Sequence, residues 1–168
     1  MRIFFRRLTN DDLPLMHEWL TRPHVREWWH DPSTFGAVVA EYGPVISGAD
    51  STRAYIASLD GEDVGFIQVY VVDAATRGID QFLANADQMN RGIGTAMVRA
   101  FIEHVFEDRA VAQIQTDPAP DNARAIRCYE KAGFRPVGVV DTPDGPALLM
   151  ICDRSIIQSG DCDASRST

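Results

Sequence analysis

The stretch that most constrains the fold covers residues 78–107. It begins with a short apolar run typical of a strand, with Asp80 in its middle. A loop containing Gly92 and Gly94 follows, and residues 95–107 then repeat apolar side chains at four-residue spacing, as an amphipathic helix does. Such a strand, glycine loop and helix start present backbone N–H groups at the positive end of a helix dipole. The stretch therefore predicts an anion site suited to a phosphate or pyrophosphate.

Two common phosphate loops do not fit this stretch. The Rossmann pattern G-x-G-x-x-G requires a third glycine where this chain has Met97. The Walker pattern ends in Gly-Lys-Ser/Thr, and residues 88–95 contain no lysine. A tight turn without a ligand remains the plain alternative for a Gly-x-Gly before a helix.

Length and composition bound the class of protein. A chain of 168 residues with 45% hydrophobic residues is typical of one soluble globular domain. No apolar run is long enough to cross a bilayer, and the first seven residues lack the apolar region of a signal peptide. We therefore expect a cytoplasmic protein with no membrane partner.

The charge balance is acidic, with 24 Asp and Glu against 16 Lys and Arg and a net charge of −8. This balance argues against a nucleic-acid partner, which would need a basic face. It is compatible with a cationic small substrate, although acidic proteins also use charge for solubility. The three cysteines and four histidines show no metal-ligand spacing, so no metal site and no disulfide framework are predicted.

The order of predicted elements indicates one α/β domain over residues 1–153, with a mixed central sheet flanked by helices. Strands are expected at 1–8, 53–59, 63–72, 78–83, 112–116, 134–140 and 147–153. Helices are expected between Thr9 and Pro23, and over 25–29, 33–46, 95–107 and 122–132, with a break near Gly43-Pro44. Asp60-Gly61 predicts a hairpin turn. Residues 154–168 are rich in Ser and Asp, and we expect a frayed tail there.

A second motif, at residues 122–134, narrows the class of protein. Its sequence is Asn-Ala-Arg-Ala-Ile-Arg-Cys-Tyr-Glu-Lys-Ala-Gly-Phe. It resembles the N-x-x-A-x-x-x-Y-x-K-x-G-F signature of the GCN5-related N-acetyltransferases (GNAT). The glycine loop resembles their acetyl-CoA loop, Gln/Arg-x-x-Gly-x-Gly/Ala, except that Met89 stands at its first position and Gln88 precedes it. The resemblance implies a single-domain GNAT fold and acetyl-CoA as the acetyl donor.

Five blocks narrow the resemblance to the aminoglycoside 6'-N-acetyltransferases. They are Glu27-Trp28-Trp29, residues 77–86 (RGIDQFLANA), residues 114–118 (IQTDP), residues 125–134 (AIRCYEKAGF) and residues 142–147 (TPDGPA). The similarity extends over nearly the whole chain, to about Asp153. It implies acetylation of the 6'-amino group of an aminoglycoside antibiotic by direct transfer in a ternary complex, without a metal, and hence antibiotic resistance.

The resemblance also implies roles for particular residues. Asp80 is the expected catalytic carboxylate beside the amine, and Tyr129 the expected donor to the departing thiolate. The expected substrate-binding residues are Trp29, Asp80, Asp117 and Asp144. The expected cofactor-binding residues are Phe82, Leu83 and Ala84 on the strand edge, then Met89, Asn90, Arg91, Gly92, Ile93, Gly94 and Thr95 in the loop, and Asn122.

The residues alone leave plainer alternatives for several of these positions. Asp117 and Asp144 each lie beside a proline and are equally typical of turns. Of the two adjacent tryptophans, Trp28 and Trp29, we expect one to pack in the core and the other to line a pocket. Tyr129 could be an ordinary helix tyrosine packed on the core.

One departure from the family keeps a rival open. The family has a longer acidic and tryptophan-rich segment between its third and fourth strands, whereas residues 72–77 leave room here only for a tight connection containing Asp73. A GNAT enzyme that acetylates a protein, a peptide or another small amine is therefore the alternative. A non-catalytic acyl-CoA or drug-binding module is a third possibility, against which the presence of both Asp80 and Tyr129 argues. The sequence does not distinguish a monomer from a homodimer.

Overall fold

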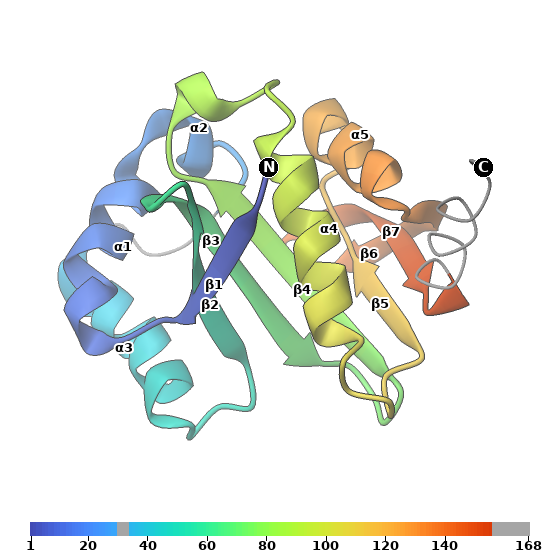
Figure 1. Cartoon of the computed structure of the whole chain (residues 1–168), viewed down its shortest axis with the longest axis horizontal. Coiled ribbons are helices and arrows are strands. Elements are labelled where there is room, and N and C mark those ends of the chain that lie inside the picture. Colours follow the sequence, from blue (N-terminus) through green and yellow to red (C-terminus); the bar gives the residue numbers. More distant parts are fainter. Residues whose placement is uncertain (30–33, 156–168) are drawn as a thin grey trace, which may run out of the picture. The chain divides into compact units, whose positions relative to one another are not determined.

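The computed structural model describes residues 1–29 and 34–155 (Figure 1). In chain order the elements are β1 (Ile3–Arg7), η1 (Asn10–Asp12), α1 (Leu13–Thr21), α2 (Pro23–Arg26), α3 (Phe35–Ser47), β2 (Arg53–Leu59), β3 (Glu62–Val71), β4 (Thr76–Leu83), η2 (Ala86–Gln88), α4 (Ile93–Val105), β5 (Gln113–Thr116), α5 (Ala123–Ala132), β6 (Arg135–Thr142) and β7 (Gly145–Asp153), where η denotes a 3-10 helix. Hydrogen bonds connect the strands of the described residues in the order β1-β2-β3-β4-β5-β7-β6.

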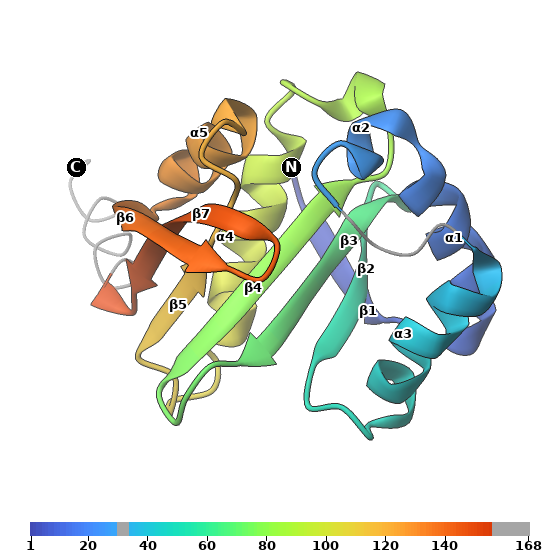
Figure 2. The ribbon, with the colours of Figure 1, turned by 180° about the vertical axis from the view of Figure 1, so that it is seen from behind.

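The chain forms two compact units, and β4 and α4 contribute to both. The first unit comprises Met1–Tyr70 and Asp80–Met97, and the second comprises Val71–Ile79 and the described part of Val98–Thr168. In the first unit, β2 pairs antiparallel with both β1 and β3. In the second unit, the start of β4 pairs parallel with β5, while β5 pairs antiparallel with β7 and β7 with β6 (Figure 2). The sheet is therefore mixed, as predicted.

The core of the first unit lies where α1 and α3, which are side by side in both ribbon views, meet the sheet (Figures 1 and 2). Met16 of α1, Val38 of α3, and Ile56 and Phe66 of the sheet are fully buried. Burial of a side chain of this size contributes about 1.5–3 kcal/mol, so these contacts fix the helices on the sheet.

Helix α3 differs from the sequence prediction. It covers Phe35–Ser47, and Thr34 caps its start: the Thr34 Oγ1 accepts a hydrogen bond from the Ala37 N–H at 3.2 Å. It continues through Pro44 and ends at Gly48, whose φ of 81° is left-handed, so the predicted break near Gly43-Pro44 is wrong. Pro44 lies in the last turn, where its carbonyl accepts from Ser47 Oγ and the Asp50 N–H. Pro44 has no N–H to donate to the carbonyl of Ala40, so the helix continues past it with one backbone hydrogen bond fewer.

Two other local predictions are confirmed. Asp60 and Gly61 have φ values of 53° and 86° and form the predicted turn of the β2–β3 hairpin, because both positions require the left-handed region. Helix α5 covers Ala123–Ala132, in agreement with the predicted range of 122–132. Asn122 caps its start, where Oδ1 accepts from the Ala125 N–H at 3.1 Å, and Gly133 with φ 111° follows its end.

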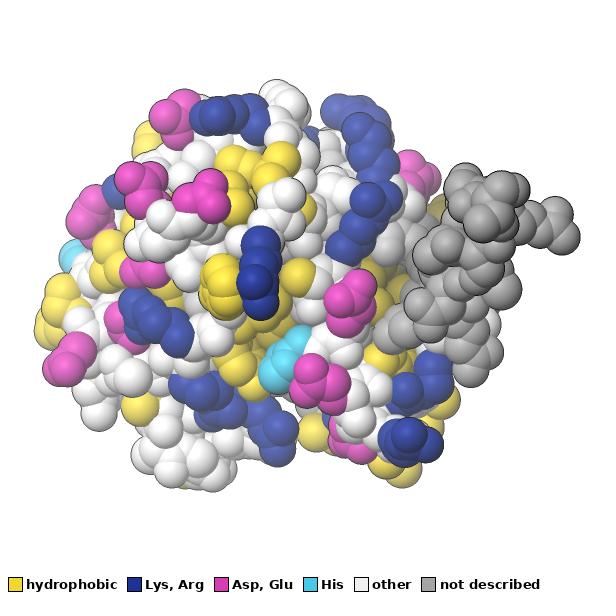
Figure 3. Space-filling model, viewed as in Figure 1, with side chains coloured by type: hydrophobic (Ala, Val, Ile, Leu, Met, Phe, Trp, Pro, Cys, Tyr) yellow, Lys and Arg dark blue, Asp and Glu magenta, His cyan; other side chains and the backbone are white. Residues whose placement is uncertain are grey.

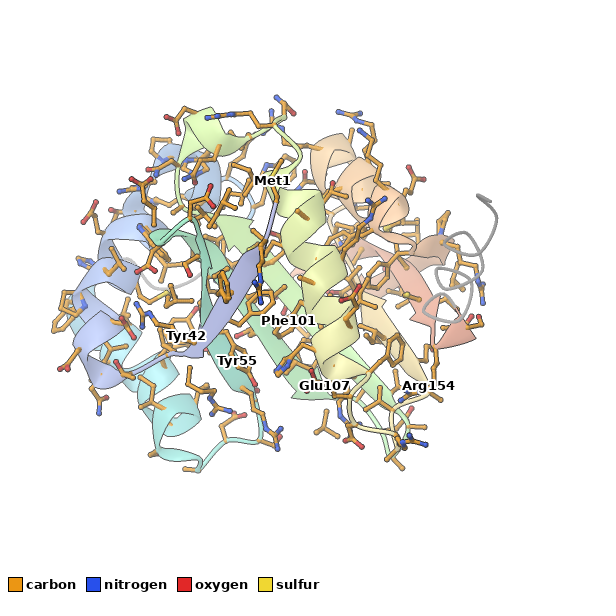
Figure 4. The ribbon with its side chains drawn as sticks, in the orientation of Figure 1. Met1, Tyr42, Tyr55, Phe101, Glu107 and Arg154 are labelled. Carbon is orange, nitrogen blue, oxygen red and sulfur yellow. The ribbon has the colours of Figure 1, made fainter. Side chains whose placement is uncertain are left out.

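The end of β7 is tied to the second unit by Arg154. Its guanidinium donates to the carbonyls of Phe106 at 2.8 Å and Asp108 at 2.6 Å, and Nε donates to that of Val111 at 2.9 Å. It also lies over the Phe106 ring, 4.9 Å from the centroid; Arg154 is labelled in Figure 4. The predicted tail therefore begins with an anchored residue, and residues 156–168 lie outside the described chain.

The surface is well charged. Figure 3 shows acidic and basic side chains interspersed on one face of the molecule. No helix in the described ranges combines the length and apolar character that a membrane span needs.

Candidate functional site

Asp80 lies on β4 in an apolar setting. Its neighbour Ile79 is fully buried, and Asp80 itself is half-buried. Gln68 of β3 donates from Nε2 to Asp80 Oδ2 at 3.1 Å. A carboxylate in such a position costs free energy unless hydrogen bonds or a positive group compensate, and the Gln68 amide supplies one such bond. The sequence analysis did not identify Gln68, because a lone glutamine on a strand carries no motif.

Trp29 packs against two aromatic side chains of the first unit's core. Its ring makes edge contacts with Phe66 at 5.8 Å and Phe82 at 5.1 Å between centroids. Trp28 and Trp29 are both partly buried, so neither is a wholly internal residue. We expected one tryptophan to pack in the core and the other to line a pocket. Trp29 alone has both a core contact and a partly exposed side chain.

The end of β4 is held by two side chains from the α1–α2 region. His24 Nε2 lies 3.0 Å from the Leu83 carbonyl oxygen, and Arg22 donates to the Ala84 carbonyl at 2.6 Å. The side chains of Phe82 and Ala84 are buried. A cofactor arm that adds to this edge would therefore use backbone groups other than these two carbonyls. No motif in the sequence pointed to His24 or Arg22, because their partners lie 59 and 62 residues away along the chain.

The glycine loop has the backbone that its sequence predicts. Asn90 and Gly92 adopt left-handed φ values of 61° and 81°, and the Ala96 N–H donates to the Gly92 carbonyl at 3.0 Å as α4 begins. A Cβ placed on Gly92 would meet nothing closer than the Met1 Cε at 3.8 Å, and Met1 is labelled near this end of α4 in Figure 4.

The exposure of the loop fits an anionic ligand. Asn90, Arg91 and Gly92 are exposed, Ile93 is buried, and the remaining predicted loop residues, Met89, Gly94 and Thr95, are partly buried. The thirteen-residue helix α4 gives the loop a full helix dipole, and Arg91 adds a positive charge. These features suit the pyrophosphate of acetyl-CoA.

The charge of Asp144 acts on the Asp117 carboxyl. Asp117 follows β5 and is half-buried; this burial and, secondarily, the charge of Asp144 raise the pKa of its carboxyl above the ordinary value. Asp144 is exposed in the β6–β7 turn, where its N–H donates to Thr142 Oγ1 at 3.3 Å. Asp144 is a turn residue, as the plain alternative stated, whereas Asp117 follows β5 outside any assigned turn. A desolvated carboxylate under the influence of a second one also suits a cation.

Asn122 lies at the N-cap of α5, and Tyr129 lies two turns further along the helix. Asn122 Oδ1 caps the helix, which leaves its amide nitrogen as the donor for a ligand. Tyr129 is buried and packs edge-on against Phe134 at 5.4 Å, so it has the core contact that its plain alternative predicts.

The predicted residues thus form two groups, one in each unit. The first unit holds Trp29, Asp80, Phe82, Leu83, Ala84 and the loop residues Met89–Thr95, and the second holds Asp117, Asn122, Tyr129 and Asp144. Within the units, the structure brings Trp29 against Phe82, and Asp117 near Asp144.

Comparison with protein families defines the class. The model of the acetyltransferase (GNAT) domain matches residues 9–142, which include the glycine loop and all of α5. The chain therefore belongs to the GNAT acetyltransferases, and the predicted fold class is confirmed.

Individual relatives indicate which group of GNAT enzymes the chain resembles. The chain is 44% identical to aminoglycoside N(6')-acetyltransferase type 1 of Klebsiella pneumoniae, over 93% of this chain and 85% of that protein. It is 55% identical to the kanamycin resistance protein of Rhizobium radiobacter, over 55% of this chain and 85% of that protein. Among solved structures, the chain is similar to AAC(6')-Ib in complex with coenzyme A and kanamycin. The two sequences are 44% identical, the match covers 99% of this chain and 100% of that one, and the TM-score is 0.88. These relatives place the chain among the aminoglycoside N(6')-acetyltransferases.

Proposed function

We propose that this protein transfers the acetyl group of acetyl-CoA to the 6'-amino group of an aminoglycoside and so confers resistance. The observation that carries the proposal is Asp80, a carboxylate held on the strand that leads into the glycine loop. It occurs in a chain 44% identical to a structure that contains coenzyme A and kanamycin.

The acceptor chemistry follows from the carboxylates. An aminoglycoside carries several ammonium groups, and one of them near Asp117 would stabilise the charge of a carboxyl whose pKa is raised by burial and by the charge of Asp144. Trp29 offers the partly open aromatic face against which a sugar ring can pack. These contacts bind the substrate, whereas Asp80 receives the reacting amine.

Acetyl-CoA supplies the acetyl group, and this chain's residues would hold it through three features. The loop Asn90–Gly94, with the charge of Arg91, binds the pyrophosphate at the start of α4. The edge of β4 near Leu83 pairs with the amide-containing arm as an added strand does. Asn122 supplies a side-chain amide to the same arm.

The transfer needs one base and one acid. The amine must lose a proton before it attacks, and Asp80 takes that proton directly or through water. As the N–C bond forms and the C–S bond breaks, Tyr129 donates its hydroxyl proton or a hydrogen bond to the departing thiolate. The nitrogen gives up its second proton as the amide forms, and this proton balances the one that the thiolate gains, restoring the Tyr129 hydroxyl. We place this reaction in the cytoplasm, where acetyl-CoA is supplied, with the protein acting as a monomer or a homodimer.

The test is a thiol-release assay with acetyl-CoA and a panel of aminoglycosides. Compounds with a 6'-amino group should release coenzyme A, and a matched compound with a 6'-hydroxyl group should not. Mass spectrometry of the product should show one added acetyl group at the 6'-nitrogen. Release that is equal for both compounds, or that depends on neither, would contradict the proposal.

One observation favours the rival substrate class. The β3–β4 connection is closed tightly by Asp73, whose Oδ1 accepts from the N–H groups of Ala75 and Thr76, both at 2.8 Å. Without a long cover at this position, a peptide chain could reach the acceptor side. Peptides with a free N-terminus or a lysine therefore belong in the same assay, and faster release with them than with any aminoglycoside would favour the rival.

A further inference from the structure

The strands β3 and β4 form a ladder of matched pairs in the first unit. The Ala84 N–H donates to the Val64 carbonyl at 2.9 Å, which fixes the register at one end. Two residues further along β3, the Phe66 ring stacks on Phe82, with centroids 5.3 Å apart and planes 21° apart. The next pair on the same face is Gln68 with Asp80.

This ladder makes the Gln68–Asp80 contact a directly cross-strand one. Side chains at such positions are among the closest in a sheet, and the backbone on both sides sets their separation. On β2, the residue opposite Gln68 is Ala54, whose small buried side chain offers no polar group. The amide of Gln68 is therefore directed to Asp80 by its strand position.

The orientation of the amide follows from charge. Nε2 must face an ionised carboxylate, because Oε1 in its place would set two acceptors against each other. The bond then occupies an acceptor position on Oδ2. An ionised carboxylate has about four such positions on two oxygens, so it can accept from Gln68 and still accept from an ammonium group.

We propose that Gln68 is a positioning residue for the acetyl transfer: it holds Oδ2 of Asp80, so that Oδ1 takes the proton of the substrate amine. The proton leaves the ammonium nitrogen for Oδ1, and Gln68 keeps its own protons throughout. This inference rests on the proposed function of Asp80. It adds a residue that acts through Asp80 without contacting the substrate.

The test is a double-mutant cycle with Gln68→Met, which keeps the length of the side chain and removes the donor. With kanamycin as acceptor, kcat should fall about 10- to 100-fold, as expected for losing a hydrogen bond to a charged group. The KM for acetyl-CoA should not change. Asp80→Asn should lower kcat about 10²- to 10⁴-fold, as for loss of general acid–base catalysis. Adding Gln68→Met to Asp80→Asn should then have no further effect.

A matched control exists in the second unit. Gln113 of β5 donates to Asp153 Oδ1 of β7 at 3.0 Å, also between directly opposite residues of neighbouring strands. Gln113→Met removes the same kind of bond, so it should change the melting temperature about as much as Gln68→Met does, and leave kcat unchanged.

Several outcomes would overturn the inference. The first is that Gln68→Met retains the kcat of the parent. The second is that Gln68→Met lowers kcat by the same factor in the parent and in the Asp80→Asn variant, which would mean that Gln68 acts independently of Asp80. Near-normal turnover in Asp80→Asn would have the same consequence. If the parent acetylates no aminoglycoside, the proposed function fails separately. The inference is then decided by ¹³C NMR titration of the Asp80 carboxyl, whose midpoint must rise in Gln68→Met.

Discussion

Single residues show how two carboxylates of one protein lie in different electrostatic surroundings. Asp80 accepts a hydrogen bond from Gln68, which favours its charged form in an apolar strand. Asp117 lies beside a second carboxylate, and its burial and that charge raise its pKa. The first arrangement suits a group that takes a proton in a fixed direction. The second suits a group that needs a bound cation.

The Asp117 carboxyl should therefore oppose folding while it favours binding. Because its pKa in the folded protein is above the unfolded value, the folded state binds the proton more tightly, and stability falls as the pH rises through that pKa. Asp117→Asn removes this cost, so its melting temperature should exceed the parent's at pH 7. The advantage should shrink as the pH is lowered towards the pKa of the carboxyl.

The same substitution should weaken aminoglycoside binding by about 1–3 kcal/mol, the range for losing a charge-assisted hydrogen bond. Scanning calorimetry and titration calorimetry on one preparation measure both effects. Acetyl-CoA affinity serves as the internal control and should not change. A variant that is less stable than the parent and binds the drug equally well would show that Asp117 is only a turn residue.

At the scale of elements, the same left-handed backbone conformation occurs in the glycine loop before α4 and at the end of α3. Gly92 before α4 and Gly48 after α3 both have φ of 81°. Gly48 has no atom within 4 Å of its missing Cβ, and Gly92 has only the Met1 side chain at 3.8 Å. A β-branched side chain at either position meets the same backbone strain and no close contact.

This similarity makes Gly48→Val the control for Gly92→Val. Both variants should lose similar stability, because the strain is the same. Only Gly92→Val should lose acetyl-CoA affinity, since its side chain would stand where the pyrophosphate approaches the N–H groups. Calorimetric titration with coenzyme A measures the difference. Equal affinities in the two variants would remove the loop from the cofactor site.

A second element-scale prediction concerns the close approach of β3 to β4. A Cβ on Gly65 would lie 2.4 Å from the carbonyl oxygen of Phe82, and this backbone group cannot move without disturbing β4. Gly65→Ala should cost roughly 1–3 kcal/mol, as overpacking does. Gly138 of β6 has nothing within 4 Å of its Cβ position, so Gly138→Ala is the control, expected within about 0.5 kcal/mol of the parent. Urea unfolding decides, and equal midpoints would contradict the prediction.

The elements also show what the sequence could predict. The Asp60-Gly61 turn, the caps of α5 and the loop glycines were predictable, because each depends on neighbours within a few residues. Gln68 was not, because its role depends on the β3–β4 register. The last turn of α3 beyond Pro44 was missed because a proline normally ends a helix. The resemblance to the aminoglycoside 6'-N-acetyltransferases suggested Asp117 and Asp144, but the burial of Asp117 and the effect of the Asp144 charge on its pKa depend on the folded structure.

At the scale of the whole molecule, charge links the fold to its proposed substrate. The net charge is −8, and a multiply charged cation is attracted to such a protein before it reaches any particular residue. Exposed charges farther apart than the Debye length, about 10 Å at 0.1 M salt, are largely screened from each other. The attraction of the substrate by the net charge should therefore depend little on which single charge is removed. The contact between an ammonium group and a particular carboxylate should depend on that carboxylate.

The last prediction separates these two contributions. The kcat/KM for kanamycin should fall steadily as sodium chloride rises from about 0.05 to 0.5 M, because screening weakens both contributions. Asp144→Asn and Glu103→Gln each remove one negative charge from an exposed residue, so they alter the net charge equally. If the Asp117–Asp144 pair binds the drug, Asp144→Asn should flatten the salt dependence and Glu103→Gln should leave it as in the parent. Stopped-flow or steady-state rates at five salt concentrations measure the slopes. Identical slopes in the two variants would mean that only net charge attracts the drug, and a flat profile in the parent would exclude an ionic contribution to its recognition.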